Sequence, residues 1–304
     1  MSPDAGVCVR AAGWLASVQR PDGSWGYRSD GEGYVEPTAL AALAFCRTLD
    51  DRGLRDGTAR AANWLLTNQH PDGSWSTTPA TDPQSWATGY AVLALAKLAI
   101  ALKSQEFVNA ARQGFGALLA TPTLYVPEIE IAVSRATMGV DARIAGWAWR
   151  PNDASWVFPT SIAIIAACSL GATDHPRVRQ GVAYLLDRAC SSGGWNIGSP
   201  LNFGEPVDPN PIDTSVALLA LQAAGTEGML AAKPAVDVLA ELASRSATPL
   251  SLAWSALALR ALGHSADDTL ARLARQQSPA GDWRGNVVTA SLVILASQPA
   301  PVGL

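Results

Sequence analysis

The sequence WLASVQRPDGSW spans residues 14–25, and WLLTNQHPDGSW spans residues 64–75. The two share an aromatic residue, a leucine, a glutamine, the turn Pro-Asp-Gly and a tryptophan, all in one register. LARQQSPAGDW at residues 273–283 keeps the leucine, glutamine, glycine and tryptophan. YLLDRACSSGGW at residues 184–195 keeps the same positions except the glutamine. Four copies with one spacing are typical of a repeat protein, so this repeat decides the fold.

A second repeat, rich in alanine and leucine, follows the first. Its copies are TALAALAFC from Thr38, TGYAVLALA from Thr88, TSIAIIAAC from Thr160, TSVALLALQ from Thr214, and TASLVILAS from Thr289. SLAWSALALRALG, which begins at Ser251, has Leu252 at the threonine position. Thirteen residues separate Trp25 from Thr38, and the same distance separates Trp147 from Thr160. Trp147 is therefore assigned to the repeat tryptophan of an altered third copy.

Each repeat is predicted to be two helices joined by a turn rich in Gly, Pro and Asp. The first helix is amphipathic, as at residues 58–69 and 177–188, and Pro-Asp-Gly ends it. The second is apolar on nearly all sides, which is typical of a buried helix. Six such hairpins predict one all-α domain over residues 1–304, an (α/α)6 barrel or toroid. The stretch from about residue 121 to 158 is expected to be an insertion in the third hairpin.

Composition excludes two classes of protein. The chain has 304 residues, of which 48% are hydrophobic and 16% are charged. So much apolar side chain can offset the entropy lost on folding, which excludes intrinsic disorder. The net charge is -4, and no basic cluster is present in the sequence. A nucleic-acid partner is therefore not expected, because such proteins carry a cationic face.

Sequence features also predict a location for the protein. The chain has four cysteines without a CxxC pair, Cys8, Cys46, Cys168 and Cys190, which are expected to be reduced thiols. The opening MSPDAGVCVR lacks the basic start and apolar core of a secretion signal. The longest apolar run, residues 90–102, is interrupted by Lys97 and is too short to cross a bilayer. A cytoplasmic protein without a transmembrane segment is expected.

The Gln-to-Trp repeat resembles the QW motif of squalene and oxidosqualene cyclases, over nearly the whole chain. The same α/α barrel occurs in class II terpene cyclases and in protein prenyltransferase β-subunits. The resemblance implies a single-barrel relative of these proteins, with an isoprenoid or another small hydrophobic molecule as its ligand. It is specific for the fold and the superfamily, and less specific for the reaction.

Three carboxylates are candidates for a catalytic acid. Class II cyclases protonate an alkene with an Asp-x-Asp-Asp motif, whose middle aspartate is the acid. The nearest match is NPIDTS at residues 210–215, in which Asp213 matches the last aspartate and Ile212 stands at the position of the acid. Glu36 occupies the acid's register in the first repeat, and Asp153 lies in the turn before the third inner helix. Asp213 is equally suited to capping its helix, and solvated loop carboxylates are the alternative reading of Glu36 and Asp153.

Aromatic residues gather just before the inner helices or on their first turns. These candidate substrate-binding residues are Tyr34, Trp86, Trp147, Trp149, Trp156, Phe158 and Trp254. An aromatic face stabilises a nearby cation by about 0.5–2 kcal/mol, which suits a carbocation intermediate. Core packing explains such residues equally well. The segment GWAWRPNDASWVF, at residues 146–158, contains three tryptophans and is the most unusual of these stretches.

No cofactor is expected. Prenyltransferase β-subunits hold zinc with Asp, Cys and His, but Cys190 has no Asp-x-Cys partner, and the three histidines lie in outer turns or helix starts. The pairs Asp50-Asp51 and Asp267-Asp268 lack the third carboxylate of a magnesium-diphosphate motif. No glycine-rich phosphate loop is present either. Metal ligands are therefore predicted to be absent.

Together these features lead to one main hypothesis and two alternatives. The main hypothesis is a terpene-cyclase-like protein that binds an isoprenoid or other polyene in an apolar central cavity lined by aromatic residues. If it is an enzyme, acid-initiated cyclisation or rearrangement would use Glu36, Asp153 or Asp213 as the acid. The first alternative is a non-catalytic barrel that binds a hydrophobic ligand or a partner protein. The second is a carbohydrate-active α/α barrel, which would need two carboxyl groups across an open groove.

Overall fold

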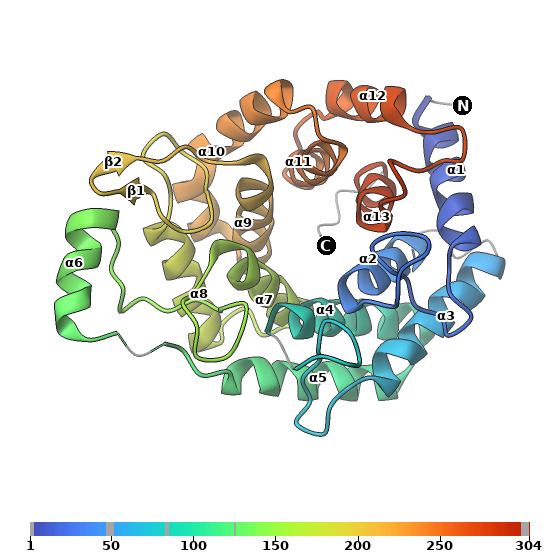
Figure 1. Ribbon diagram of the computed structural model, residues 1–304, viewed down its shortest axis with the longest axis horizontal. Coiled ribbons are helices and arrows are strands. Elements are labelled where there is room, and N and C mark those ends of the chain that lie inside the picture. Colours follow the sequence, from blue (N-terminus) through green and yellow to red (C-terminus); the bar gives the residue numbers. More distant parts are fainter. Residues whose placement is uncertain (1–2, 47–51, 83–84, 125, 299–303) are drawn as a thin grey trace.

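A computed structural model of the protein describes residues 3–46, 52–82, 85–124, 126–298 and 304 (Figure 1). Over these residues the chain forms thirteen α-helices and one short β-hairpin. The first seven helices are α1 (Pro3–Ser17), α2 (Val35–Cys46), α3 (Arg52–Thr67), α4 (Ser85–Leu102), α5 (Gln105–Ala120), α6 (Glu128–Met138) and α7 (Val157–Ser169). The others are α8 (Pro176–Asp187), α9 (Pro211–Ala224), α10 (Thr226–Arg245), α11 (Pro249–Ala261), α12 (Asp267–Gln276) and α13 (Val287–Ala296). The strands β1 (Leu201–Asn202) and β2 (Glu205–Pro206) pair antiparallel.

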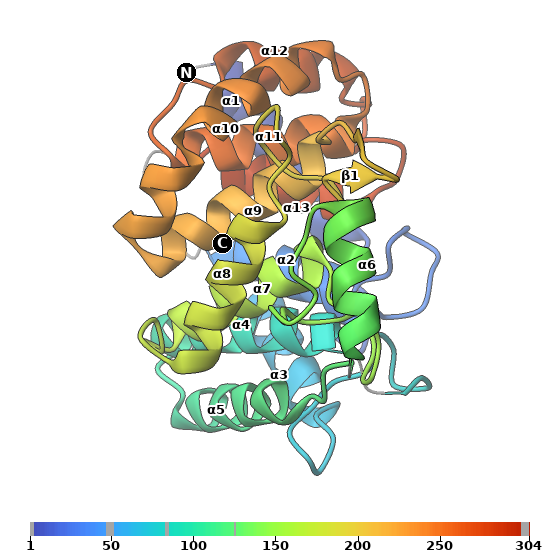
Figure 2. The same cartoon turned by 90° about the vertical axis from the view of Figure 1, so that its left-hand side faces the viewer.

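The helices form two concentric layers. In the inner layer, α2, α4, α7, α9, α11 and α13 each pack against the next, and α13 packs against α2, which closes the ring. The helices α1, α3, α5, α8, α10 and α12 pack around the outside of this ring. The helix α6 and the β-hairpin lie outside the ring on one side of the molecule (Figure 2). The prediction of an all-helical α/α toroid is thus confirmed.

Burial differs sharply between the layers. Ten of the twelve residues of α2 are buried, whereas only four of the twelve in α8 are. A helix that is covered on every side must be apolar throughout, and small residues let its neighbours approach closely. The alanine-rich composition of the second repeat therefore places these segments in the inner ring.

The repeat tryptophans join the turn to both layers. The backbone N–H donates to the threonine hydroxyl at Trp25–Thr38 (2.9 Å), Trp75–Thr88 (2.9 Å), Trp147–Thr160 (2.7 Å) and Trp195–Thr214 (3.0 Å). The indole N–H donates to an outer-layer carbonyl at Trp25–Leu15 (2.8 Å), Trp75–Leu65 (2.7 Å), Trp195–Leu185 (2.6 Å) and Trp283–Leu273 (2.8 Å). The spacing that recurs in the sequence is thus the spacing that satisfies these buried donors.

Each of the three repeat glutamines links the end of its own outer helix to the neighbouring outer helix. The Gln19 amide donates to the carbonyl of Gly57 on α3 (2.9 Å), and the Gln69 amide donates to that of Ala110 on α5 (2.9 Å). In the last repeat, Gln277 donates to the carbonyl of Val7 on α1 (2.9 Å). This last bond connects α12 to α1 and closes the outer layer as well.

Close packing requires a glycine two residues before the repeat tryptophan in three of the copies, at Gly23, Gly73 and Gly281. At Gly281 the backbone φ is +103°, which is unfavourable for residues with a side chain. A Cβ atom there would lie 2.3 Å from the carbonyl oxygen of Arg10 on α1. The turn can therefore touch the neighbouring outer helix only where it has no side chain.

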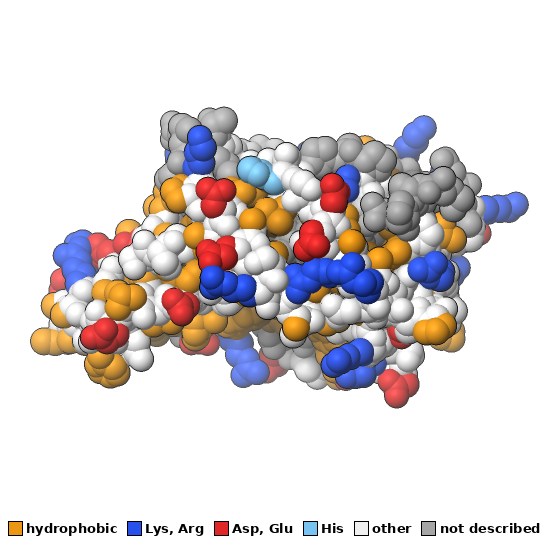
Figure 3. All heavy atoms as spheres, turned by 90° about the horizontal axis from the view of Figure 1, so that it is seen from above, with side chains coloured by type: hydrophobic (Ala, Val, Ile, Leu, Met, Phe, Trp, Pro, Cys, Tyr) orange, Lys and Arg blue, Asp and Glu red, His pale blue; other side chains and the backbone are white. Residues whose placement is uncertain are grey.

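One face of the molecule shows a mixture of charges. Seen from the edge that α10 and α12 form, acidic and basic side chains are interspersed among hydrophobic ones (Figure 3). Of the helices in the described part of the chain, none is both long and apolar enough to cross a membrane.

Candidate functional site

Five aromatic side chains come together at one end of the inner ring. Trp86 and Tyr90 lie on α4, Phe158 lies on α7, Trp254 lies on α11, and Trp149 lies in the loop before α7. All four helical members lie in the first two turns of their helices. We call these five residues the aromatic cluster.

The cluster is continuous from α4 to α11. Phe158 stacks on Trp149, with ring centroids 5.5 Å apart and planes at 16°, and it meets Trp254 edge to face at 6.0 Å. Trp86 lies 5.5 Å from Trp149 and 6.3 Å from Tyr90. Tyr90 and Trp254 are fully buried, whereas the other three rings are partly exposed. Trp86, Trp149 and Phe158 are therefore the members of the cluster that retain accessible surface.

Position relative to the repeat threonine decides which side chains join the cluster. Trp86 and Phe158 each lie two residues before the threonine of their helix. Tyr90 lies two residues after its threonine, and Trp254 lies two residues after the leucine that replaces the threonine in α11. Residues four apart lie on the same face of a helix. Glu36 also lies two residues before its threonine, so it shares this register.

Glu36 lies in the first turn of α2 and is half-buried. The Tyr27 hydroxyl donates a hydrogen bond to Glu36 Oε2. The Tyr90 hydroxyl is fully buried and interacts with the same carboxylate, although among the described residues it has no partner at hydrogen-bond geometry. Burial raises the pKa of the Glu36 carboxyl, and the two tyrosine hydroxyls only partly oppose this effect. Glu36 therefore keeps its proton to a higher pH than an ordinary glutamate.

The tyrosines around Glu36 stay neutral. Burial and the neighbouring Glu36 charge raise the pKa of Tyr27 and of Tyr90 far above the usual value. The Tyr34 ring lies 4.9 Å from that of Tyr27, and its hydroxyl donates to Glu32 Oε1 (3.0 Å). Two glutamates are thus held by two tyrosines whose rings are in contact.

Tyr27 and Tyr90 were not among the residues that the sequence pattern singled out. Tyr90 could have been found because it lies four residues after Trp86, on the same helical face. Tyr27 lies two residues after a repeat tryptophan, in a loop without periodicity. Nothing in its spacing indicates that it contacts Glu36.

Asp213 has different surroundings. It is buried in the first turn of α9, and the Asn210 amide donates to its Oδ2 (2.6 Å). The Asn210 side-chain oxygen accepts from the backbone N–H of Ile212 (3.0 Å) and of Asp213 (2.9 Å), so Asn210 is the cap of α9. Burial raises the pKa of Asp213, and the Asn210 bond opposes the shift. The Asp213 charge also acts on Tyr184 of the outer helix α8.

Three other predicted residues lie apart from the cluster. Asp153 is exposed in a turn, where it accepts a hydrogen bond from the Ala154 N–H (2.7 Å). Trp147 is buried between the layers and donates its indole N–H to the carbonyl of Leu118 (2.9 Å). Trp156 lines a cavity outside the ring. The structure thus brings together Glu36, Tyr34 and the aromatic cluster, and it separates Asp153, Asp213, Trp147 and Trp156 from them.

Across the described residues, no three side chains of His, Cys, Asp or Glu lie close enough together to hold a metal ion. The aspartate pair Asp267-Asp268, which was considered for magnesium, lies in the first turn of the outer helix α12. Asp50-Asp51 fall outside the described residues.

No protein-family model and no curated protein sequence matches the chain. Solved structures match it over nearly the whole length. A protein from Actinoplanes is 20% identical, with a TM-score of 0.64, and the match covers 97% of this chain and 98% of the other. The type II terpene cyclase MstE from Scytonema is 14% identical, with a TM-score of 0.62 and 98% of each chain covered.

A third similar structure is an enzyme of carbohydrate metabolism. The α-1,6-mannanase GH76A of Salegentibacter, solved as an inactive variant with α-1,6-mannotriose, is 9% identical, with a TM-score of 0.67. The match covers 97% of this chain and 98% of the mannanase. At these identities the likenesses show the α/α toroid fold alone, and they include both a terpene cyclase and a mannanase.

Proposed function

We propose that this protein is a terpene-cyclase-like enzyme that protonates an isoprenoid or another polyene, with Glu36 as the acid. The observation that carries the proposal is the position of Glu36. It is a carboxyl group of raised pKa in the same helical register as the rings of the aromatic cluster. A protonated acid beside apolar, partly exposed aromatic rings suits an alkene substrate better than a charged one.

The proposed first step is a proton transfer from the Glu36 carboxyl to an alkene carbon. A C–H bond forms from the π electrons of the double bond, which leaves a carbocation and the Glu36 carboxylate. The Tyr27 hydroxyl already donates to Glu36 Oε2, so it stabilises the carboxylate that the step creates. The reaction ends when the cation loses a proton to a base or captures water, and Glu36 regains a proton from solvent.

The aromatic cluster would stabilise the cation during rearrangement. Each ring face contributes about 0.5–2 kcal/mol, and more where water is excluded. Trp86, Trp149 and Phe158 are the partly exposed members, so they are the faces that a substrate can reach. The D109N variant of MstE was solved in complex with geranylgeranyl dihydroxybenzoate as substrate, which makes that compound a suitable test molecule.

We also propose that residues 1–304 form one domain of six helical hairpins, the third of which carries the insertion that includes α6. Packing within the first five hairpins supports this division, since α1 packs on α2, α3 on α4, α5 on α7, α8 on α9 and α10 on α11. In the sixth, the bond from the Trp283 indole to the Leu273 carbonyl joins α12 to the turn before α13. In this arrangement Glu36 and Trp86 belong to the first two inner helices and Phe158 belongs to the third.

Product analysis tests the proposal. Purified protein is incubated with C15–C30 polyprenyl substrates, including geranylgeranyl dihydroxybenzoate, and the extracts are analysed by mass spectrometry. Glu36→Gln should abolish product formation, whereas Asp153→Asn and Asp213→Asn serve as matched controls and should retain most of it. Absence of product from the wild-type protein, together with absence of any bound lipid, would contradict the proposal.

A carbohydrate-active barrel is the second candidate. Glu32 and Glu36 each bind one of two touching tyrosines, and paired carboxyl groups are the machinery of glycoside hydrolysis. Release of sugars from α-1,6-mannooligosaccharides, lost in both Glu32→Gln and Glu36→Gln, would support this function over the first. A barrel that only binds a lipid or a protein would keep its ligand in Glu36→Gln and form no product from either substrate class.

A further inference from the structure

Most of the exposed large apolar side chains lie on two segments that interrupt the repeat. One is the insertion at residues 121–158, and the other lies between Trp195 and Thr214, which are nineteen residues apart instead of thirteen. Of the eight large apolar side chains that are exposed in the described part of the chain, five are in these segments: Leu124, Ile129, Val133, Ile197 and Phe203. Large exposed apolar areas mark sites of interaction, so a partner is expected on this side of the molecule.

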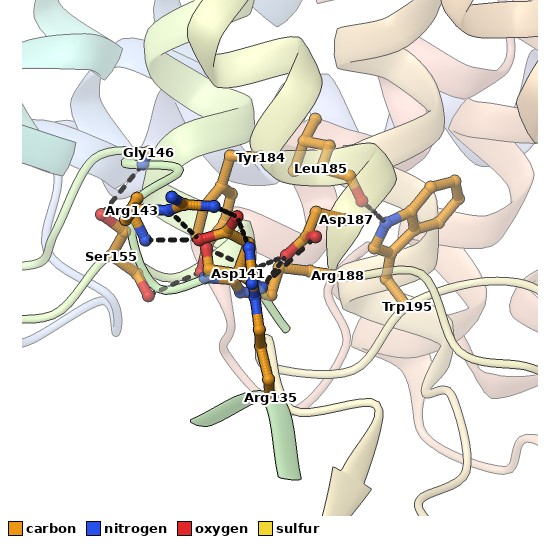
Figure 4. A network of polar contacts seen from close by, with 10 residues as sticks. All are labelled: Arg135, Asp141, Arg143, Gly146, Ser155, Tyr184, Leu185, Asp187, Arg188 and Trp195. Atoms are coloured by element: carbon orange, nitrogen blue, oxygen red, sulfur yellow. Dashed lines mark hydrogen bonds and ion pairs between the residues drawn. The ribbon is translucent and has the colours of Figure 1, made fainter. Parts of the chain in front are cut away.

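One side of α6 is fixed to the rest of the molecule. Ile131 is buried on this side. The backbone N–H of Gly204, in the β-hairpin, donates to the carbonyl of Thr137 on α6 (3.0 Å). Asp141, which follows α6, donates its backbone N–H to the carboxylate of Asp187 at the end of α8 (3.1 Å), within the polar network of Figure 4. The helix α6 therefore has a defined position on α8 and the β-hairpin.

The opposite side of α6 is apolar and exposed. It carries Ile129, Ala132, Val133 and Ala136, whose spacing of three, one and three residues places them along a single side of a helix. Ile129 is 74% exposed and Val133 is 53% exposed, and both alanines are exposed as well. The helix lies at an edge of the molecule, with no described helix or strand beyond it (Figure 1). We call these four residues the α6 stripe.

The α6 stripe differs from the exposed side of an ordinary outer helix. In α12 four of the five exposed residues are polar: Asp267, Asp268, Ala271, Arg275 and Gln276. In α6, by contrast, the buried Ile131 and the stripe lie on opposite sides, so the helix is apolar on both. A helix with apolar residues on both sides is normally covered on both. The described part of one chain covers only the side of Ile131, so the stripe is suited to a cover from outside the chain.

The side-chain sizes of the stripe complement a second copy of it. Large and small residues alternate along α6, from Ile129 through Ala132 and Val133 to Ala136. If two copies of α6 pack antiparallel about a twofold axis between residues 132 and 133, Ile129 lies opposite Ala136 of the second copy, and Val133 lies opposite Ala132 of the second copy. Each large side chain then meets a small one, which lets the helices approach closely. Parallel helices would instead place each large side chain against its own copy.

The charges at one edge of the stripe fit the same antiparallel arrangement. Glu128 and Arg135 lie seven residues apart, about two turns, on one edge of α6. Equal edges meet in an antiparallel pair, so each Glu128 would lie beside Arg135 of the second copy. Within one chain, Arg135 shares the carboxylate of Asp141 with Arg143, each at 2.6 Å. Glu128 forms no ion pair in the described part of the chain, although its charge reaches Arg143, so a second copy would supply its partner.

We propose that the α6 stripe is a dimerisation surface, on which α6 of a second copy of this chain packs antiparallel, with Glu128 of each copy beside Arg135 of the other. An interface centred on one pair of eleven-residue helices buries less than about 1,200 Å² in total, which is the size of a weak and reversible complex. A dissociation constant on the order of 10 μM is therefore expected. The inference does not depend on the reaction proposed for Glu36, because the stripe shares no residue with the aromatic cluster.

Sedimentation equilibrium of the full chain, at concentrations from about 1 to about 200 μM, measures the association directly. Val133→Glu places a charge at the centre of the stripe and should weaken dimerisation more than about tenfold, because the charge would be buried against apolar side chains. Val9→Glu is the matched control, since Val9 is 68% exposed on the outer helix α1, and it should dimerise as the wild type does. Unchanged helical circular dichroism shows that both variants are folded.

An exchange of charges tests the orientation of the two helices. Glu128→Arg should weaken dimerisation about threefold to tenfold, because each new arginine faces Arg135 of the second copy. Adding Arg135→Glu to this variant reverses both charges and should restore association to the wild-type level. Parallel helices would place equal charges side by side in all three proteins, so the second substitution would rescue nothing.

Three results would overturn the proposal. The first is a wild-type chain that stays monomeric at about 200 μM. The second is an equal loss of association in Val133→Glu and Val9→Glu, and the third is a failure of Arg135→Glu to rescue Glu128→Arg. A monomeric wild type that binds phosphatidylcholine vesicles, with binding lost in Val133→Glu, would assign the stripe to a membrane instead of a second copy.

Discussion

Glu36 and Asp213 occupy the starts of two inner helices and differ by one residue in register. Glu36 lies two residues before Thr38, and Asp213 lies one residue before Thr214. Successive residues of an α-helix are turned by about 100° around its axis, so the two carboxyl groups leave their helices in different directions. Glu36 meets two tyrosine hydroxyls in the register of the aromatic cluster, whereas Asp213 is bound by the amide of Asn210.

The difference separates two uses of a buried carboxyl group. Burial raises the pKa of both groups. The partner of Asp213 is the residue that caps α9, so this carboxyl group belongs to the framework of the helix start. The partners of Glu36 are phenols from a loop and from another helix, and neither belongs to the cap of α2. Register, more than burial, therefore distinguishes a candidate acid from a structural one.

The largest effect is expected from neutralising the two carboxyl groups separately. Glu36→Gln removes the proposed proton donor, and we expect product formation to fall by about 10²–10⁴-fold. Asp213→Asn should retain most of the product formation, because an amide can still bond to Asn210. Initial rates of product formation, measured by mass spectrometry on folded variants, give the comparison. Equal losses in both variants would remove the distinction between the two registers.

A second experiment moves the acid from one helix to another. Ile212 lies two residues before Thr214, at the α9 position that corresponds to Glu36. Adding Ile212→Glu to the Glu36→Gln protein should raise the rate of product formation about tenfold above that of Glu36→Gln alone. The reason is that the new carboxyl group occupies the same register on α9. Asp213→Glu in the same background is the matched control and should restore none. Recovery in the control alone would contradict the role of register.

A third experiment removes one partner of Glu36. Tyr27→Phe deletes the hydroxyl that favours the charged carboxylate, so the pKa of Glu36 should rise further. The high-pH limb of the rate profile, where the acid loses its proton, should then shift to higher pH, with a rate change of only about twofold to tenfold. Tyr34→Phe, which deletes the hydroxyl bound to Glu32, should leave that limb in place. A shift toward lower pH in Tyr27→Phe would show that Glu36 is not the titrating acid.

The smallest effect concerns stability. Because the folded-state pKa of Glu36 is above its unfolded value, the native state binds more protons between the two values. The free energy of unfolding should therefore fall as the pH rises through this window, and the loss should be complete above the folded pKa. Glu36→Gln should flatten this part of the curve in urea denaturation at a series of pH values. Asp213→Asn should flatten it too, since the pKa of Asp213 is also raised, so only the activity profile separates the two groups.

How far the sequence predicts this molecule depends on the repeat. The toroid follows from the spacing of Trp25 to Thr38 and its copies, because each spacing corresponds to one set of buried hydrogen bonds. The register of Glu36 could be predicted for the same reason. Its contacts with Tyr27 and Tyr90 could not, because a loop and a separate repeat supply them. The cavity beside Trp156 could not be predicted either, since most of its lining comes from an insertion that has no copy elsewhere in the chain.

The first and last outer helices, α1 and α12, pack against each other as other neighbouring outer helices do. Gln277 bonds to Val7 of α1, and the turn at Gly281 lies against Arg10 of the same helix. The junction between the two ends of the chain thus has the same contacts as the junctions between repeats that the chain connects. A circularly permuted gene, opened at an exposed outer connection and joined between α13 and α1 by a flexible linker, should still assemble the same ring. Folding of such a permutant would make every repeat an equivalent starting point for protein engineering.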